Sequence, residues 1–296
     1  MNILLIGCGR TGRAIAESLL ELTYVKKVFL YSRTSKSSKA LACDLDSNRV
    51  EVVDSIYLIK NLDYAIITLS GMSDSARSES MNKRHTTYEV RQDELKFNIG
   101  AIGYLLKDLN RLDKKTKIII VTNPVDEITN YIQSMLPTKT ILGFGLELDA
   151  KRYEKILGKK VLCIGSHGKA IPLINAKSEK EYSTLLTKTD SELLANIRKH
   201  GIPHKLAGAA FKSFFDRLNS TKEEIIHVSS FIKKPVMGIQ NISISLPFRV
   251  KNGNIIEIAK LQVNEIEKKR FLSSIKELQE SITHIIATHK KLVEYK

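Results

Sequence analysis

An apolar run at the start of the chain leads directly into a glycine-rich loop. Residues 2–6 are expected to form a buried strand, and the loop after it reads Gly7-Cys8-Gly9-Arg10-Thr11-Gly12. An amphipathic stretch at 12–22 follows, with apolar side chains at helical spacing. In such a unit the first glycine makes the tight turn, the second lets the backbone approach a pyrophosphate, and the third lets helix and strand pack closely. The helix amino terminus can then bind phosphate, so the six loop residues predict a dinucleotide site. A tight turn without a ligand is the alternative.

The first half of the chain continues to alternate apolar strands with amphipathic helices. The strands expected after the loop cover residues 26–32, 63–71, 117–124 and 138–145. Fully apolar strands separated by helices indicate a parallel sheet that is covered on both faces. The pattern changes near Leu146, where shorter strands mix with helices. We therefore predict an α/β protein, with a doubly wound parallel sheet of the Rossmann type at 1–145 and a second, α+β domain at 146–296.

Composition excludes several classes of function. The 296 residues are 43% hydrophobic and carry 47 basic and 32 acidic side chains, a formal net charge of +15. The basic residues are spread along the chain without a basic arm, which favours a solvated surface that attracts small anions over a nucleic-acid partner. The three cysteines lie far apart without metal-ligand spacing, so we expect no metal site and a reducing compartment. No segment is apolar and long enough to span a bilayer. We expect a cytoplasmic protein without a membrane partner.

The second strand bears on the choice of dinucleotide. A carboxylate that reads a free ribose hydroxyl is expected at the end of this strand, roughly 20 residues after the loop. Ser32 and Arg33 stand there instead. A small hydroxyl beside a guanidinium suits a 2′-phosphate, because arginine can donate two parallel hydrogen bonds to phosphate. The pair favours NADP over NAD, unless Arg33 simply points into solvent.

Four later segments complete a recognisable order of motifs. They read VRQDELKFN (90–98), VTNPVD (121–126), LELDAKRY (146–153) and IGSHGK (164–169). Behind a dinucleotide loop, these segments resemble the L-lactate/L-malate dehydrogenase family over most of the chain. The resemblance implies NAD(P)-dependent hydride transfer between a 2-hydroxy acid and a 2-keto acid, a catalytic domain at 146–296, a small anionic substrate, and a homodimer or homotetramer.

The resemblance also assigns roles to individual residues. His167 matches the proton donor and acceptor, for which histidine has a suitable ordinary pKa. Asp149 matches the carboxylate that fixes the histidine tautomer, and Arg152 the arginine that grips the substrate carboxylate. Arg91 matches the arginine that polarises the reacting carbonyl. Asn123 matches an asparagine that touches both substrate and cofactor. Taken singly, each has a plainer interpretation as a surface ion pair, a turn or a solvated helix start.

The loop before Arg91 departs from the family pattern. It runs 20 positions from Gly71, about ten more than the family has, and its polar composition predicts an exposed, mobile segment that could act as a lid. The position six before the catalytic arginine selects the substrate in this family and holds His85 here, neither the glutamine of lactate nor the arginine of malate enzymes. Three nearby cations make a dicarboxylate substrate an open possibility: Arg77, Lys83 and Arg84.

Two further positions are unusual for the family. Lys169 stands where the family has an aspartate after His-Gly, and it would disfavour the imidazolium if it converged on His167 rather than pointing outward. Ala210, on the segment that matches the helix bearing a substrate-pocket residue, leaves room for a side chain larger than a methyl group.

Two other functions fit the dinucleotide loop. A binding protein could sense dinucleotides without turnover. An NAD-dependent glycosidase on the same scaffold would use a cysteine and a histidine around a divalent metal, but no cysteine adjoins His167, and Cys163 lies four residues before it.

Overall fold

We describe the fold from a computed structural model that covers residues 1–84, 86–200 and 204–294, without the side chains of 87, 88 and 288–294. The strands are β1 (Asn2–Ile6), β2 (Lys27–Tyr31), β3 (Val50–Val52), β4 (Tyr64–Ile67), β5 (Lys117–Ile120), β6 (Ile141–Gly143), β7 (Cys163–Ile164), β8 (Ile171–Pro172), β9 (Glu224–Ile232), β10 (Ile242–Lys251) and β11 (Asn254–Ile258). The α-helices are α1 (Arg10–Leu20), α2 (Ser35–Leu45), α3 (Asp74–Lys83), α4 (Thr87–Gly103), α5 (Leu106–Arg111), α6 (Val125–Met135), α7 (Leu146–Leu157), α8 (Glu179–His200), α9 (His204–Leu218) and α10 (Glu265–Glu294).

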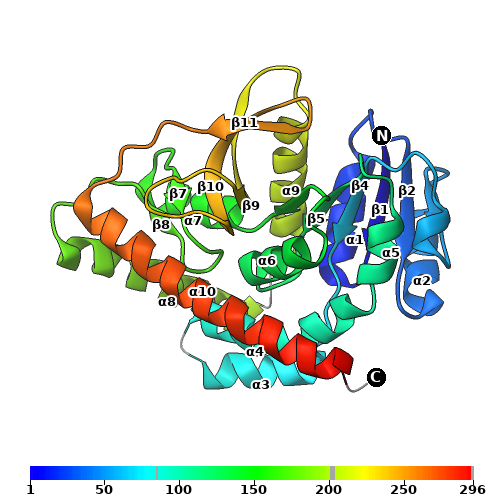
Figure 1. Ribbon diagram of the computed structural model, residues 1–296, viewed down its shortest axis with the longest axis horizontal. Coiled ribbons are helices and arrows are strands. Elements are labelled where there is room, and N and C mark those ends of the chain that lie inside the picture. The colour runs from blue at the N-terminus through cyan, green and yellow to red at the C-terminus, as the bar shows by residue number, and fades with distance from the viewer. Residues whose placement is uncertain (85, 201–203, 295–296) are drawn as a thin grey trace.

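Nine strands form one sheet in the order β11-β10-β9-β6-β5-β4-β1-β2-β3 (Figure 1). The six strands of the first half are parallel and follow the order of a doubly wound dinucleotide fold, with β1 between β4 and β2. The three later strands are antiparallel, and β9 pairs with β6, the last strand of the parallel part, at Gly143 and Ser229. A separate pair, β7 and β8, carries the turn at His167. A single sheet therefore crosses the predicted boundary near residue 145, which stays a prediction.

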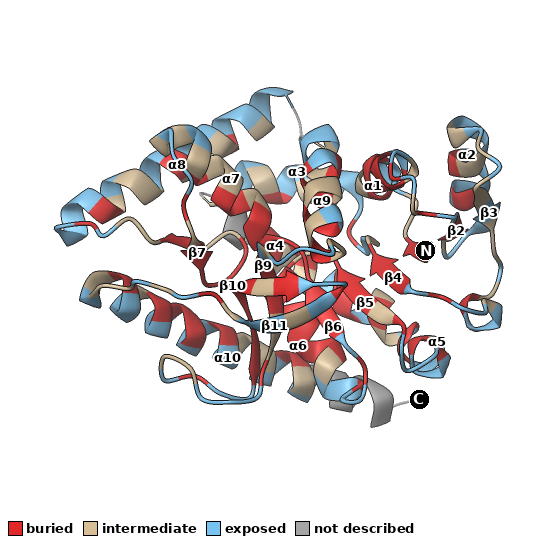
Figure 2. Cartoon of the chain, turned by 90° about the horizontal axis from the view of Figure 1, so that it is seen from above, coloured by how far each residue is buried: buried red, intermediate tan, exposed pale blue. Residues whose placement is uncertain are grey.

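Apolar side chains on the two faces of β1 enter two different cores. Ile3 and Leu5 belong to a cluster with buried residues of α1 and α9, whereas Leu4 and Ile6 belong to a cluster with α4, α5 and α6. Helices cover both faces of the parallel sheet (Figure 2). This explains why β1 is continuously apolar from Ile3 to Ile6, since both faces are buried over these residues.

Helix α9 of the second half packs closely on α1 of the first half. A Cβ atom at Gly208 would lie 2.5 Å from the carbonyl oxygen of Ala14, so only glycine permits this approach. The contact brings the start of α9 to the glycine-rich loop, where His204 Nδ1 lies 3.1 Å from Thr11 Oγ1. The second half of the chain therefore supplies one wall of the dinucleotide region.

The stretch between Gly71 and Arg91 contains a helix, α3, where the sequence predicts a mobile loop. The side chain of Ser73 caps this helix by accepting a hydrogen bond from the amide of Ala76. Its polar residues bind α4, because Arg77 Nε donates to Glu94 Oε1 at 2.6 Å and Ser80 Oγ donates to Asp93 Oδ2 at 2.7 Å. The helix could not be predicted from apolar periodicity, because polar contacts rather than apolar burial attach it to α4.

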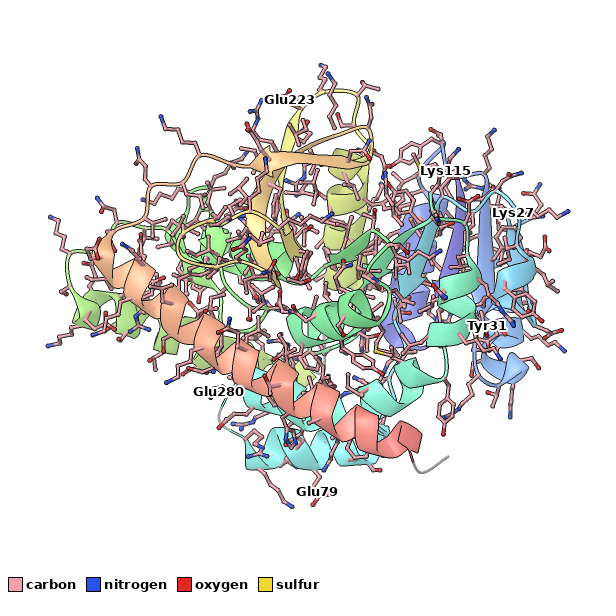
Figure 3. The ribbon with its side chains drawn as sticks, viewed as in Figure 1. Lys27, Tyr31, Glu79, Lys115, Glu223 and Glu280 are labelled. Atoms are coloured by element: carbon pink, nitrogen blue, oxygen red, sulfur yellow. The ribbon has the colours of Figure 1, made fainter. Side chains whose placement is uncertain are left out.

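Charged side chains project from separate parts of the surface, as Lys27, Lys115 and Glu223 show (Figure 3). Among the described residues, no helix combines the length and the apolar character needed to cross a membrane.

Candidate active site

His167 and Asp149 form a buried pair at the centre of the candidate site. His167 lies in the turn between β7 and β8, and Asp149 in the first turn of α7. The two side chains are only 5% and 6% exposed, and Nδ1 of the histidine lies 2.7 Å from Oδ2 of the carboxylate. A Cβ atom at Gly145 would come within 2.6 Å of the imidazole Cγ, so the glycine before α7 makes room for the ring.

Asp149 also fixes its surroundings. Its Oδ2 accepts a hydrogen bond from the Gly168 amide at 2.9 Å, and its Oδ1 accepts one from Arg152 Nη1 at 2.6 Å. Burial raises the pKa of this carboxyl group, but its interaction with His167, including the hydrogen bond, and the charges of Arg152 and Arg91 outweigh that effect and hold the pKa well below its usual range. An ionised Asp149 requires the proton on Nδ1, which leaves Nε2 of His167 to act on a ligand.

Burial, together with the neighbouring guanidinium of Arg91, lowers the pKa of His167 to about 4, and the charge and hydrogen bond of Asp149 offset this only in part. Arg91 is itself buried on α4. A Cβ atom at Gly168 would overlap the Arg91 guanidinium, and Gly168 has a φ of +89° that favours glycine. The His167-Gly168 turn therefore admits Arg91 beside the imidazole.

Asp126 is a functional candidate that was not predicted from the sequence. This buried residue follows the strand β5 in the segment TNPVD, and its Oδ2 accepts the backbone N–H of His167 at 2.8 Å. Its Oδ1 accepts a hydrogen bond from Ser245 Oγ at 2.7 Å. Burial raises its pKa, although the hydrogen bonds from His167 and Ser245 oppose that effect. The signal available from sequence was a carboxylate in the first turn of an amphipathic helix that follows a strand end.

A cavity of about 150 Å³ brings the predicted residues together. The predicted residues that line it are Thr11, Arg77, Arg91, Asn123, Arg152 and His167. Asn123 is held by Asn98, whose Nδ2 donates to the Asn123 carbonyl at 2.6 Å. Apolar side chains of α8 and α9 complete the wall. His167, Arg91, Arg152 and Asn123 thus line one cavity together with Thr11 of the glycine-rich loop.

The glycine-rich loop has the geometry of a phosphate cradle. Gly7 has a φ of +109°, and a Cβ atom there would lie 2.6 Å from the Leu69 amide nitrogen. A Cβ atom at Gly12 would overlap the Gly7 carbonyl, whereas nothing lies within 4 Å of one at Gly9. Gly9 is the N-cap of α1 and offers no side-chain hydrogen bond to its first amides. Space and amides are therefore present where a pyrophosphate would bind.

Other predicted residues lie around this cradle. Arg10 forms an exposed ion pair with Asp74 of α3 at 2.6 Å. Ser32 Oγ donates to the Thr34 carbonyl at 2.7 Å and accepts from the Ser38 amide at 3.0 Å. Arg33 is exposed. Both Ser32 and Arg33 follow β2, which is parallel to and adjacent to β1.

The residues predicted from the long loop differ in where the structure places them. Of the three cations near the long loop, only Arg77 lines the cavity, and it is paired with the buried Glu94. Lys83 and Arg84 form exposed ion pairs with Glu79 and Asp93. His85 lies outside the described residues.

Two positions differ from what the family pattern suggests. Ala210 is buried in the apolar core and does not line the cavity, where Leu206 and Ala207 of the same helix lie instead. Lys169 pairs with Glu277 of α10, so its ammonium group is directed away from His167. Among the described residues, no cluster of histidine, cysteine, aspartate and glutamate is arranged to hold a metal ion.

Comparisons with known proteins place this geometry in context. No family model matches the chain. It is 24% identical over 312 aligned residues to the L-2-hydroxycarboxylate dehydrogenase (NAD(P)(+)) of Methanocaldococcus jannaschii, covering 93% of this chain and 96% of that protein. It is 26% identical over 319 residues to the L-lactate dehydrogenase of Fervidobacterium nodosum, covering 96% and 98%.

Solved structures agree in fold. The malate dehydrogenase of Salinibacter ruber superposes with a TM-score of 0.79 at 17% identity over 98% of this chain and 99% of that chain. The malate dehydrogenase of Archaeoglobus fulgidus in complex with NADH gives 0.76 at 20% identity, over 96% and 99%. The predicted fold class and the resemblance to lactate and malate dehydrogenases are therefore confirmed over nearly the whole chain.

Proposed function

We propose that the protein is an NAD(P)-dependent dehydrogenase of the lactate/malate type, which interconverts a 2-hydroxy acid and a 2-keto acid. The observation that carries this proposal is the His167–Asp149 pair, whose histidine lines one cavity together with Arg91, Arg152 and Asn123. The named relatives are dehydrogenases of hydroxy acids, and similarity to them extends over nearly the full chain. A dinucleotide-binding protein that lacks turnover has no need of such a buried acid–base pair.

Each of these residues has its own role in the proposed reaction. A bound nicotinamide would supply or accept the hydride. Arg152 binds the substrate carboxylate, and Arg91 stabilises negative charge on the carbonyl oxygen. His167 gives the proton from Nε2 to that oxygen in reduction and takes it back in oxidation. Asp149 holds the proton on Nδ1 and stabilises the imidazolium in between, as the aspartate of a hydrolase triad does.

The cavity indicates a small substrate. Its volume of about 150 Å³ admits a short-chain acid, and the arginines favour an anion. Arg77 is the cation placed to meet a second carboxylate, but Glu94 already pairs with it at 2.6 Å, and Ser70 Oγ accepts from its Nη2 at 2.7 Å. A substrate with a second carboxylate would have to displace these partners. We therefore favour a monocarboxylic 2-keto acid.

We further propose that NADP is the preferred cofactor. Ser32 and Arg33 follow β2 at the position where a carboxylate would accept hydrogen bonds from the ribose of NAD. The exposed guanidinium of Arg33 can pair with a 2′-phosphate. Ser32→Asp should shift the preference from NADPH towards NADH, and an unchanged ratio of the two kcat/KM values would contradict this assignment.

We also propose a cytoplasmic homo-oligomer, in line with the expectation from sequence. Sedimentation of the purified protein tests the assembly.

The activity is tested by incubating the protein with NADPH or NADH and a panel of 2-keto acids: pyruvate, oxaloacetate, and branched and aromatic analogues. Loss of the reduced nicotinamide absorbance with at least one acid supports the proposal. If no acid is turned over while either dinucleotide binds, the protein is a dinucleotide-binding protein without turnover and the proposal is wrong.

A further inference from the structure

A second and larger cavity lies at the opposite end of the parallel strands from the cavity at His167. The cavity at His167 adjoins Val121 and Phe144, which follow β5 and β6, whereas this one adjoins Lys117 and Thr140, where those strands begin. Its volume is about 600 Å³, within the range of small-molecule sites. The two cavities have no lining residue in common. A ligand here would therefore not compete with one at His167.

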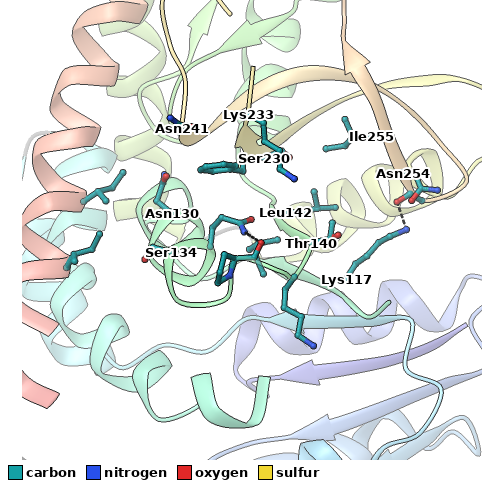
Figure 4. A pocket seen from close by; sticks show the side chains of 18 residues that line it. Lys117, Asn130, Ser134, Thr140, Leu142, Ser230, Lys233, Asn241, Asn254 and Ile255 are labelled. Carbon is teal, nitrogen blue, oxygen red and sulfur yellow. Dashed lines mark hydrogen bonds between the residues drawn. The ribbon is translucent and has the colours of Figure 1, made fainter. Parts of the chain in front are cut away.

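The charge of the second cavity is positive. Its described lining includes three lysines and no aspartate or glutamate. Lys139 directs its ammonium to the carbonyls of Leu112 and Asp113, so mainly its stem faces the cavity. Lys117 and Lys233 remain, and Leu142 lies between them in Figure 4. Neither forms an ion pair with a described carboxylate, so their charges favour an anion.

Lys117 is the more constrained of the two cations. Its Nζ donates to the Gly253 carbonyl at 2.7 Å, which leaves further donors of the ammonium group. Burial lowers its pKa, although the charge of Asp63 opposes the effect. An anion near this half-buried ammonium would compensate the cost of its desolvation.

The rest of the wall fits a ligand with both an apolar body and polar groups. Phe231 offers an aromatic ring, and Ile255 and Ile282 extend the apolar surface across β11 and α10. Asn241 and Asn130 stand at the same end of the cavity in Figure 4; the Asn130 amide is bonded to the backbone of Asp126 and Ser243, so Asn241 is the amide placed to meet a ligand. An inorganic ion would leave most of this surface uncovered.

We propose that this cavity binds a small organic anion with a planar apolar body, whose acidic group lies between Lys117 and Lys233. The planar body packs on Phe231 and the isoleucines, and the amide of Asn241 satisfies a polar substituent. This site is separate from the dehydrogenase site and does not depend on the function proposed for that site.

The test is a titration of the purified full-length protein with 8-anilinonaphthalene-1-sulfonate, an aromatic anion, followed by calorimetry and fluorescence. We expect one site per chain, retained in excess NADP⁺. Lys233→Gln changes an exposed side chain, and we expect it to weaken binding by about tenfold, the order of one lost charge contact. Lys117→Gln should weaken it at least as much. Lys115→Gln, an exposed lysine outside the cavity, is the matched control and should leave the affinity unchanged.

Ser134→Phe fills the cavity from the end of α6 and should remove binding, with thermal melting used to verify that each variant is folded. The proposal is wrong if the probe does not bind. It is equally wrong if NADP⁺ displaces the probe completely, or if folded Lys233→Gln and Ser134→Phe proteins bind it as the wild type does.

Discussion

Nδ1 of His167 lies 2.7 Å from Oδ2 of Asp149, and the same carboxylate oxygen accepts the backbone N–H of Gly168 at 2.9 Å. One aspartate therefore fixes both the tautomer of the imidazole and the turn that carries it. Because Arg152 binds the other oxygen of this carboxylate, the arginine proposed to bind the substrate and the proposed acid–base histidine are held by a single side chain.

Replacing Asp149 should uncouple chemistry from cofactor binding. Asp149→Asn keeps the shape of the side chain but removes the charge that stabilises the imidazolium. We expect kcat for keto-acid reduction to fall by about 10³-fold or more, with little change in the dinucleotide Kd. Steady-state kinetics and fluorescence titration measure the two quantities. Glu154→Gln on the same helix is the control, and comparable losses in both variants would count against a specific role for Asp149.

The pKa of His167 predicts opposite pH dependences for the two directions. Because that pKa is lowered to about 4, the free protein holds a neutral imidazole near pH 7, which is the form that accepts a proton. We expect kcat/KM for hydroxy-acid oxidation to stay level down to about pH 5 and to fall as the pH drops through the His167 pKa. Keto-acid reduction needs the imidazolium, so its kcat/KM should rise as the pH falls over the same interval.

Arg91 gives this pH prediction a second check. Removing its charge in Arg91→Gln should move the inflection of the oxidation profile to higher pH, whatever the loss in rate, since the guanidinium lowers the His167 pKa. A wild-type inflection close to the ordinary histidine value of about 6.5 would contradict the assignment.

Asp126 is expected to act as a positioning residue. Its carboxylate holds the His167 backbone through Oδ2 and Ser245 through Oδ1. Asp126→Asn weakens the hydrogen bond to the His167 amide, and we expect kcat to fall by about tenfold while KM for the keto acid stays near the wild-type value. Ser245→Ala disturbs only the second oxygen and should cost less. A change in KM with unaltered kcat, or a larger loss in Ser245→Ala, would show that Asp126 does not position His167.

Lys169 should be dispensable. Its ion pair with Glu277 joins two side chains that are 35% and 49% exposed, and such pairs contribute about 1 kcal/mol or less. We expect Lys169→Met to retain the wild-type kcat and pH profile, with at most a small change in the free energy of unfolding. A shift of the oxidation profile in this variant would mean that the ammonium influences the imidazole after all.

How far sequence could lead depends on the range of each interaction. The glycine-rich loop and the strand before it could be predicted because their signals are local and continuous. The pairing of His167 with Asp149 could be predicted only from the order of the family motifs. The contact between Asp126 and the His167 backbone joins residues 41 positions apart, and the Lys169–Glu277 pair joins residues 108 apart. Neither contact can be predicted from the local sequence pattern. The cavity at Lys117 likewise arises from segments that only the folded sheet brings together.

The most direct test of the central claim is the rate of NADPH oxidation by His167→Ala with the 2-keto acid that the wild type turns over best. We predict a loss of about 10³-fold or more in kcat with a nearly unchanged Kd for NADPH, because the variant removes the proton donor without touching the glycine-rich loop. A His167→Ala protein that reduces the keto acid at the wild-type rate would contradict it.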